Sequence, residues 1–257
     1  MIITTGDHEA PDAVRRAEHL AVELGIPYVR RNRTSLTRLA AQQQTDAIFV
    51  ILEQGIRLIT SDHASMAFHP SMSFVRAKRL LKGESDVMLH IAKVSAGDQI
   101  IDCTAGLGSD SIVFSLAAGK EGRVTAVESS LPLYGLLKEG LKTYTSGVKE
   151  FDEALRRIEV QHANHLDVLR ALPDKSVDIV YFDPMFRDPV MESSSISPMR
   201  IFANGESLME LSISEACRVA RKTVILKEKR DSGEFSRLGF SVYERSHTKI
   251  AYGVIAL

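Results

Sequence analysis

The second part of the chain, from Gln99 onward, alternates short apolar runs with amphipathic stretches, which predicts strands and helices in turn. Five runs predict strands, at Gln99–Cys103, Arg123–Glu128, Arg157–Gln161, Val177–Phe182 and Thr223–Lys227. The stretches that follow them predict helices, at Asp110–Ala118, Leu131–Tyr144, Lys149–Leu155, Asp167–Leu172 and Gly205–Ala220. Several strand candidates are continuously apolar, which is typical of parallel strands covered by helices on both faces.

Two further strand candidates, Phe240–Glu244 and Lys249–Ala256, follow each other across a short polar turn and predict an antiparallel hairpin. The predicted fold class is therefore α/β. It consists of a Rossmann-like, doubly wound, mainly parallel sheet with a C-terminal antiparallel hairpin.

The beginning of the chain has a different pattern, which predicts a small N-terminal α/β domain over residues 1–73. Its expected elements are a strand at Ile2–Thr4, a helix at Asp12–Leu24 ended by Gly25, a strand near Tyr28, a helix at Ser35–Gln43 and a hairpin over Ala47–Thr60. Residues 74–257 then form the second domain. Its first part, Arg76–Val94, predicts linking helices with a break near Gly83.

Composition places the chain among ordinary folded proteins, with 257 residues of which 44% are hydrophobic and 25% charged. The net charge of -1 gives no global sign of a nucleic-acid partner. No apolar run approaches the roughly 20 residues of a membrane-spanning helix, and the polar N-terminus is no signal peptide, so we expect a cytoplasmic protein without a membrane partner. Cys103 and Cys217 lack the spacing of a zinc site, and no metal is expected.

A glycine-containing loop between the first predicted strand of this domain and its helix is the strongest local signal. The strand ends in Asp102, and Thr104, Ala105, Gly106 and Gly108 lead to a helix that we expect Ser109 or Asp110 to cap. Glycines let a backbone turn sharply and approach a ligand closely, at the sheet edge where doubly wound folds bind ligands. The alternative is a tight strand-to-helix connection with no ligand.

Three observations favour a nucleoside without phosphates at this edge. Position 111 is Ser111, so the third glycine of a dinucleotide-binding loop is missing. The next strand ends in Glu128, whose carboxylate suits a ribose diol. Asn164, His165 and Asp183 follow the next strands at the same edge. S-adenosylmethionine has a ribose and an adenine but no phosphate, and it is the cofactor that these features predict.

The fourth predicted strand leads into Asp183-Pro184-Met185-Phe186, which resembles the loop of enzymes that methylate exocyclic amines. The lone pair of an aryl amine is delocalised, and hydrogen bonds from its N–H groups to Asp183 and to the Pro184 carbonyl would orient it. Phe186 would stack on the base, and Pro184 would stiffen the turn. The alternative is a strand-ending turn followed by a core phenylalanine.

Together, Thr104–Gly108, the acidic Glu128, Asp183–Phe186 and the later Met199–Phe202 resemble the bacterial 16S ribosomal RNA (guanine-N2) methyltransferases of the YhiQ type. The similarity runs from about His69 to the end. It implies methyl transfer from S-adenosylmethionine to a guanine N2, with ribosomal RNA or the small ribosomal subunit as partner. The family's cofactor positions fall here on Ser109, Asp110, Glu128, Ser129, Asn164, His165 and Asp183.

The chain departs from the family at Ser109, where an arginine is usual, and after Phe186, where Arg187–Pro189 and a serine-rich run replace a proline and lysines. Other interpretations therefore stay open. They are a methyltransferase for a protein or small molecule, a non-catalytic nucleoside-binding protein and, last, a nicotinamide-dependent dehydrogenase. The sequence leaves open whether the chain is a monomer or a homodimer.

Basic residues cluster at Arg30–Arg33, Arg76–Arg79 and Lys227–Arg230. If these clusters share a face, they would neutralise RNA phosphates, with the N-terminal domain helping to select the substrate. The alternative for the first two clusters is ordinary solvated surface. Lys227–Arg230 is the exception, because it leaves the fifth predicted strand at the ligand-binding edge.

Overall fold

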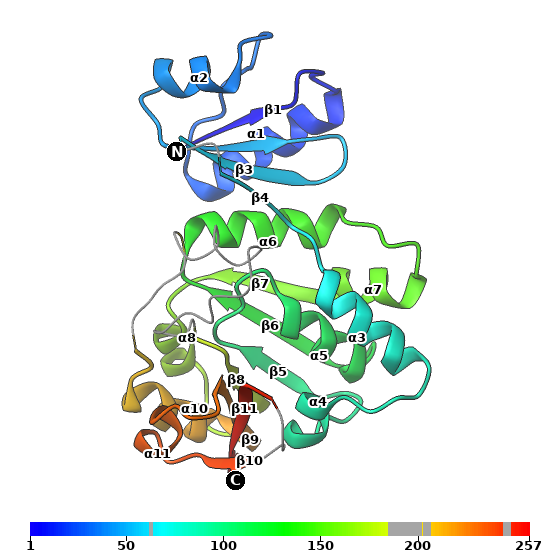
Figure 1. The fold of residues 1–257 in the computed structure, drawn as a ribbon, viewed down its shortest axis with the longest axis vertical. Helices are drawn as coiled ribbons and strands as arrows, with labels where there is room; N and C mark the ends of the chain where they lie inside the picture. The colour runs from blue at the N-terminus through cyan, green and yellow to red at the C-terminus, as the bar shows by residue number, and fades with distance from the viewer. Residues whose placement is uncertain (62–63, 185–201, 203–206, 244–247) are drawn as a thin grey trace.

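The computed structural model describes residues 1–61, 64–184, 202, 207–243 and 248–257, which form two sheets and their surrounding helices (Figure 1). The larger sheet has seven strands in the order β10-β11-β9-β8-β5-β6-β7. Their bounds are β5 Gln99–Asp102, β6 Arg123–Glu128, β7 Ile158–His162, β8 Val177–Phe182, β9 Ala220–Lys229, β10 Ser241–Tyr243 and β11 Ile250–Ala256. Strands β5 to β9 are parallel to one another, and β11 is antiparallel to both β9 and β10. The predicted α/β fold with a C-terminal hairpin is confirmed.

Helices cover both faces of this sheet, as the continuous apolar strands predict. Their bounds are α3 Ser71–Leu81, α4 Val87–Ala92, α5 Ser109–Ala118, α6 Leu131–Thr143, α7 Lys149–Arg157, α8 His165–Ala171, α10 Glu210–Val219 and α11 Glu234–Arg237. Alternate side chains of a strand point to opposite faces. Ile179 and Tyr181 of β8 accordingly join the core beneath α4 and α5, while Val180 and Phe182 join the core beneath α8 and α10. The linking helices α3 and α4 are separated near Gly83, as expected.

The order of the strands places a topological switch point at β5. From β5 the chain continues to β6 and β7 on one side and returns to β8 and β9 on the other. The helices after β5 and β8 therefore lie on opposite faces, and in doubly wound folds the ligand-binding crevice lies at this point, at the carboxyl ends of the strands. We call this part of the sheet edge the crevice. This edge is where the sequence predicts the ligand.

The smaller sheet, formed by the N-terminal residues, has the order β1-β2-β3-β4. Its elements are β1 Ile2–Thr5, α1 Pro11–Leu24, α2 Leu36–Gln42, β2 Ala47–Ile51, β3 Ile56–Thr60 and β4 Ser65–Ala67. The predicted β2–β3 hairpin is confirmed, and Gly25 ends α1 with a φ of 65°. The strand expected near Tyr28 is reduced to a single bridge with Ile3, because Pro27 and the basic turn that follows leave too few residues to pair.

Helix α6 joins the two sheets, since Leu133 and Leu136 are buried in the same core as Phe49 of β2. Arg16 of α1 forms an ion pair of 2.6 Å with Glu139 of α6, and both side chains are at least nine-tenths buried. At Gly140 the chains approach so closely that a Cβ would lie 2.1 Å from Phe68 Cγ. These contacts fix the small sheet relative to the crevice.

Candidate functional site

The glycine loop closes tightly at the carboxyl end of β5. Gly106 and Gly108 have φ values of 54° and 75°, a region that favours glycine. A Cβ on Gly108 would lie 2.7 Å from Leu137 Cδ1. Gly108 is itself the N-cap of α5 and no side chain caps this helix, so the predicted cap by Ser109 or Asp110 is wrong. The reason is that Asp110 turns inward to other partners.

Asp102 is buried beneath this loop and is 1% exposed. Its carboxylate accepts hydrogen bonds from the Ser111 hydroxyl at 2.5 Å and from the Thr104 N–H at 3.2 Å. Burial raises the pKa of Asp102 to about 7, although the hydrogen bond from Ser111 lowers the pKa in part. The side chain therefore titrates near neutral pH.

The replacement Asp102→Asn should stabilise the fold at pH 8 by about 2–4 kcal/mol and leave it nearly unchanged at pH 4. The folded-state pKa lies above the value of about 3.9 in an unfolded chain, so the free energy of unfolding falls as the pH rises from 4 to 7. Asparagine does not ionise and avoids this loss. Urea unfolding at both pH values measures it. Asp98→Asn, which removes an ion pair of 2.6 Å with Lys222, is the matched control and should gain nothing at pH 8. Equal stability of the Asp102→Asn variant and the original chain at pH 8 would contradict the prediction.

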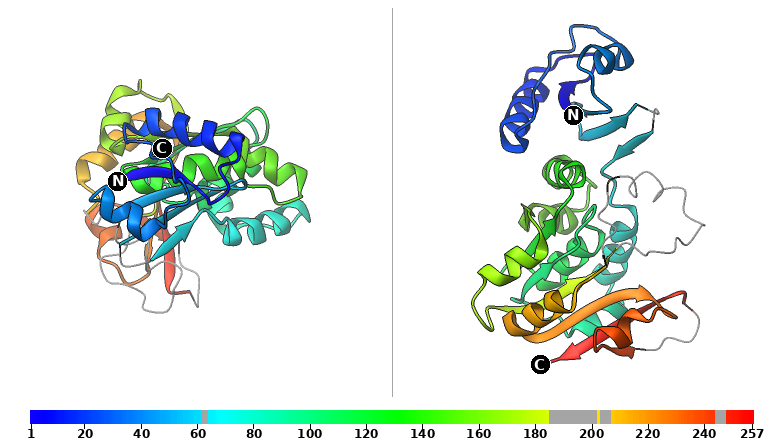
Figure 2. Two further views of the ribbon diagram at one scale, coloured as in Figure 1. Left: turned by 90° about the horizontal axis from the view of Figure 1, so that it is seen from above. Right: turned by 90° about the vertical axis from the view of Figure 1, so that its left-hand side faces the viewer.

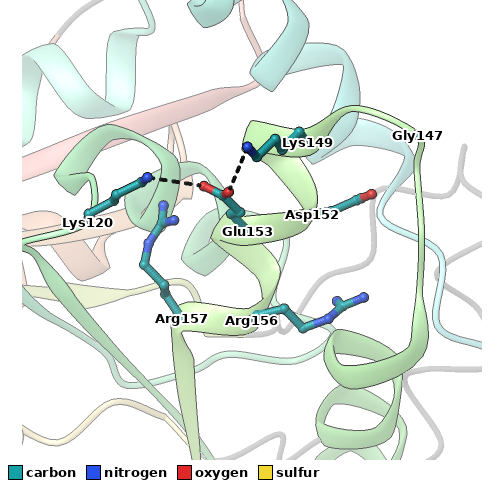
Figure 3. A pocket seen from close by; sticks show the side chains of 7 residues that line it. All are labelled: Lys120, Gly147, Lys149, Asp152, Glu153, Arg156 and Arg157. Carbon is teal, nitrogen blue, oxygen red and sulfur yellow. Dashed lines mark ion pairs between the residues drawn. The ribbon is translucent and has the colours of Figure 1, made fainter.

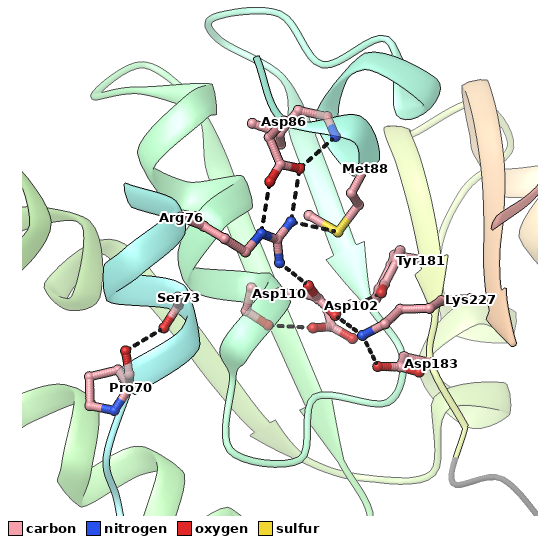
Figure 4. Close-up of polar contacts among 12 residues, drawn as sticks. Pro70, Ser73, Arg76, Asp86, Met88, Asp102, Asp110, Tyr181, Asp183 and Lys227 are labelled. Atoms are coloured by element: carbon pink, nitrogen blue, oxygen red, sulfur yellow. Dashed lines mark hydrogen bonds and ion pairs between the residues drawn. The ribbon is translucent and has the colours of Figure 1, made fainter. Parts of the chain in front are cut away.

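Asp183 follows β8 and is held from two sides at the same edge (Figure 4). Its backbone N–H donates to the Thr104 hydroxyl at 2.6 Å, and its carboxylate accepts from Lys227 Nζ at 2.6 Å. Burial and the charge of Asp110 raise the pKa of Asp183, and the Lys227 ammonium opposes this rise. The side chain keeps 26% exposure, so part of it is open to solvent.

Asp110 lies deeper, with a side chain only 7% exposed, and joins α5 to three other elements. Its carboxylate accepts from Lys227 Nζ at 2.9 Å, from the Tyr181 hydroxyl at 2.7 Å and from Arg76 at 2.5 Å. Burial alone would raise its pKa, but the charges of Lys227 and Arg76 lower the pKa of Asp110 well below its usual range. Asp110 is therefore a fixed negative charge beneath Asp183.

Arg76 reaches this group from the linking helix α3. Besides Asp110, it contacts both carboxylate oxygens of Asp86 at 2.8 and 2.9 Å. The crevice floor thus holds three aspartates, at 102, 110 and 183, and two cations, Arg76 and Lys227 (Figure 4). Once Asp102 is ionised, these five groups sum to one negative charge.

Glu128 ends β6 on the other side of the glycine loop and is 7% exposed. One carboxylate oxygen accepts from the Gly106 N–H and the other from the Ser130 N–H, both at 2.8 Å. Burial raises the pKa of Glu128, while these backbone donors lower it. Each oxygen keeps a lone pair for a further donor.

The remaining predicted positions lie at the same edge. The side chains of two of them form hydrogen bonds within the protein. Asn164 caps α8 by accepting from the Leu166 N–H, and the His165 ring lies 3.0 Å from the Ser212 hydroxyl. Ser109 and Ser129 are exposed, Ala105 is buried in the loop, and Pro184 is the last described residue after β8. Phe186 and the Met199–Ile201 part of the motif lie outside the described residues.

The interpretation from sequence missed the inward side chains of Arg76, Tyr181 and Lys227. Phosphate contacts were one hypothesis for the clusters that contain Arg76 and Lys227, and solvated surface was the alternative for that of Arg76. The structure places both residues in ion pairs with the buried Asp110 instead. One signal was available for Lys227, because it directly follows the apolar run of β9 at the ligand edge. Arg76 gave no such signal, since its partner Asp110 is far away in sequence.

A surface pocket of about 710 Å³ lies at the opposite edge of the sheet, near the end of α5 and along α7 (Figure 3). Its lysines, Lys120 and Lys149, pair with Glu153 at 3.8 and 3.9 Å. Arg156 donates to the Leu141 and Tyr144 carbonyls. This pocket holds none of the strand-end carboxylates, so the crevice remains the candidate site.

Comparison with known proteins identifies the family. A family model described as "Putative SAM-dependent methyltransferase" matches residues 32–237. The chain belongs to this methyltransferase family. The protein YpiP of Bacillus subtilis is 40% identical over 254 residues, which cover 99% of this chain and 98% of that protein. The predicted S-adenosylmethionine-dependent methyltransferase is confirmed, and the alternative functions have no support.

Other relatives of this methyltransferase carry the name ribosomal RNA small subunit methyltransferase J. That of Pseudomonas paraeruginosa is 28% identical over 85% of this chain and 82% of its own length. That of Psychrobacter arcticus is 26% identical, and the match spans only 62% of that protein. A solved SAM-dependent methyltransferase from Neisseria gonorrhoeae shares the fold, with a TM-score of 0.68, 19% identity and coverage of 100% and 96% of the two chains.

Membrane-spanning helices and metal-binding groups are both missing from the residues that the structure describes. Within ranges 1–61, 64–184, 207–243 and 248–257, no helix is long and apolar enough to cross a membrane. The same part of the chain holds no group of three or more histidine, cysteine, aspartate or glutamate side chains placed to hold a metal ion.

Proposed function

We propose that this methyltransferase transfers a methyl group from S-adenosylmethionine to the exocyclic N2 of a guanosine in small-subunit ribosomal RNA. The observation that carries the proposal is the partly exposed Asp183 carboxylate, fixed by Thr104 and Lys227 at the switch point of the sheet. The names of the relatives from Pseudomonas and Psychrobacter support the choice of acceptor.

The residues at the crevice fit the cofactor. Glu128 has free lone pairs for the two ribose hydroxyls. Glycines in the loop after β5 are the residue type that lets a backbone approach a ligand closely. With Asp102 ionised, the five groups of the crevice floor carry one net negative charge, which suits a ligand that carries a positive sulfur. We propose Asp102, Thr104–Gly106, Gly108–Asp110, Glu128–Ser129, Asn164–His165 and Asp183 as the cofactor-binding positions. S-adenosylmethionine supplies a methyl group made electrophilic by its positively charged sulfur.

In the proposed reaction Asp183 binds and orients the amine. Its free oxygen accepts an N–H of the guanine amino group, and the Pro184 carbonyl accepts the other, so that the nitrogen lone pair points toward the methyl carbon. When bound, S-adenosylmethionine would give up this carbon to the nitrogen, and the electron pair of the broken carbon–sulfur bond would stay on sulfur. The nitrogen then loses a proton to water, which makes a general base unnecessary. Phe186, outside the described residues, would stack on the base.

Lys227 holds Asp183 in the form that this reaction needs. A carboxylate accepts hydrogen bonds, whereas a protonated acid beside Asp110 would donate one. Because Lys227 contacts both carboxylates, its ammonium favours the ionised form of Asp183 and fixes the rotation of its side chain. We assign Lys227 a positioning role and no direct contact with the acceptor.

We also propose that residues 1–73 form a domain that takes part in substrate recognition, while residues 74–257 bind the cofactor. The fixed contact through α6 supports this division of roles, since it holds the small sheet beside the crevice. A cytoplasmic location, which the sequence predicts, fits a ribosomal RNA substrate.

The replacement Glu128→Ala should weaken S-adenosylmethionine binding by ~1.5–3 kcal/mol, which is about 10- to 150-fold in Kd. It removes the acceptor proposed for the ribose hydroxyls and the bonds that brace Gly106 and Ser130. Isothermal titration calorimetry measures the affinity. Glu159→Ala, on the neighbouring strand and paired with Arg123, is the matched control and should bind normally. Unchanged affinity of the Glu128 variant would remove that residue from the pocket.

Methyl transfer to purified 16S ribosomal RNA tests the proposal. Labelled S-adenosylmethionine, the purified protein and RNA from cells that lack the gene should yield N2-methylguanosine after digestion to nucleosides. Label in another nucleoside would overturn the proposed acceptor while leaving the methyltransferase activity in place. The same conclusion would follow if, with purified small ribosomal subunits as substrate, only their proteins became labelled.

A further inference from the structure

The segment between α1 and β2 is strongly basic. Residues 26–45 contain four arginines, Arg30, Arg31, Arg33 and Arg38, and no acidic residue. The whole chain has a net charge of only -1, so these charges are concentrated locally. Of the three basic clusters in the sequence, two supply a residue to the crevice, Arg76 and Lys227. The third cluster, in this segment, has no role in the crevice.

The turn that carries these arginines is firmly built. Glu9 accepts from the backbone N–H groups of Arg31 at 3.1 Å and Asn32 at 3.2 Å. The Arg31 side chain pairs with Asp7 at 2.9 Å and donates to the Thr34 carbonyl at 3.1 Å. Asn32 and Arg33 have positive φ values of 46° and 58°, which cost non-glycine residues about 1 kcal/mol or more each. The Arg31 side chain therefore stabilises this strained turn and is not available to bind a partner.

The other three arginines, Arg30, Arg33 and Arg38, are exposed, and none of them pairs with an acidic side chain in the part of the chain that the structure describes. The braced turn and the helix α2 that follows it therefore present three guanidinium groups to solvent, two from the turn and that of Arg38 from the helix. No large apolar side chain between residues 26 and 45 is exposed beside them. Protein partners usually need apolar or aromatic anchors, whereas a phosphodiester backbone needs only cations and hydrogen-bond donors.

The segment lies on the same side of the molecule as the crevice. In Figure 1 the chain around α2 is on the left, the side to which the carboxyl ends of β6 and β7 point, and Figure 2 shows this side facing the viewer. The contacts of α6 with Phe49 and Arg16 hold the two parts together. A nucleic acid bound at the crevice can therefore extend across the small sheet.

We propose that Arg30, Arg33 and Arg38 form a docking surface for the phosphodiester backbone of the RNA that carries the target guanosine. The inference rests on the proposed function. Guanidinium groups bind phosphate oxygens with two parallel hydrogen bonds, and each contact releases counterions from the RNA. This surface would position the RNA without reading its bases, while Asp183 acts on the guanine.

The test compares a triple variant, Arg30→Gln, Arg33→Gln and Arg38→Gln, with a control of equal charge change, Arg15→Gln, Arg123→Gln and Lys149→Gln. The control residues are exposed and already pair with acidic side chains. The substrate is 16S ribosomal RNA from cells that lack the gene. We expect the KM for RNA to rise at least ~10-fold in the first variant, with kcat and S-adenosylmethionine affinity unchanged. The slope of log Kd for RNA against log salt concentration should fall in magnitude by about 2 to 3. The control should keep the original values.

An unchanged KM and salt slope, in an enzyme that still methylates RNA, would overturn the docking surface and leave the proposed function intact. Loss of methylation only on assembled subunits, with a normal KM for free RNA, would assign the surface to a ribosomal protein and also overturn it. If the original chain methylates no RNA, the proposed function itself fails.

Discussion

Replacing Asp183 with alanine should lower kcat by at least ~100-fold. The side chain is the proposed acceptor for the amine N–H, and alignment of a reacting group can contribute several kcal/mol to the barrier. Removing it also leaves the Lys227 ammonium facing the crevice without its partner at 2.6 Å. Part of the loss should therefore appear as weaker binding of the positively charged cofactor. Steady-state kinetics with saturating RNA and cofactor measure kcat.

Two further variants, one at Asp183 and one at the start of β8, make this test more specific. Asp183→Asn keeps the shape, but its amide oxygen will face Lys227 and its NH2 group will face the amine, so activity should stay low. Asp178→Ala lies at the other end of the strand, where Asp178 accepts from the Gln99 N–H at 2.9 Å, and should keep a normal kcat. A normal kcat in Asp183→Ala would show that the active site lies elsewhere.

Replacing Lys227 with methionine should lower activity at pH 7 by about 10- to 100-fold and shift the acid limb of the pH–rate profile upward. Lys227 is the cation shared by Asp110 and Asp183, and burial and mutual repulsion raise the pKa of Asp183 once it is gone. Asp183 then needs a higher pH to be ionised, so activity should recover in part near pH 9. Loss of one partner from this largely buried group should also cost about 3–5 kcal/mol of stability.

Two controls separate positioning from folding. Lys222→Met changes a lysine on the same strand with an ion pair of the same length, 2.6 Å to Asp98, at the far edge. It should leave the pH profile in place. Lys227→Arg keeps the charge and should restore the acid limb. A Lys227→Met enzyme with an unshifted profile would contradict the positioning role.

The sequence predicted the large sheet well because its strands are buried on both faces. Continuous apolar runs such as Ile179–Phe182 carry that signal locally, and Gly25 gave the end of α1 for the same local reason. The prediction of a strand near Tyr28 was wrong. Only Tyr28 forms a bridge with Ile3, and the residues around it do not extend the pairing, which the local apolar pattern cannot reveal. The upstream extension of β9 to Ala220, where a helix was expected, likewise follows from pairing with Val177.

At the site, the sequence could place Asp102, Glu128 and Asp183 at one edge, since strand ends of a parallel sheet meet there. It could not give their partners. Arg76 finds Asp110 only after α3 has packed against α5, and the helix end that Asp110 was expected to cap is formed by Gly108 instead. The side chains of Asn164 and His165 turn to α8 and α10, because buried polar groups must find the nearest donors and acceptors.

The most direct test of the account is mass spectrometry of 16S ribosomal RNA nucleosides from cells with and without the gene. We expect that one N2-methylguanosine disappears on deletion, returns with the intact gene, and stays absent with the Asp183→Ala variant. An unchanged N2-methylguanosine content in the deletion strain would contradict it.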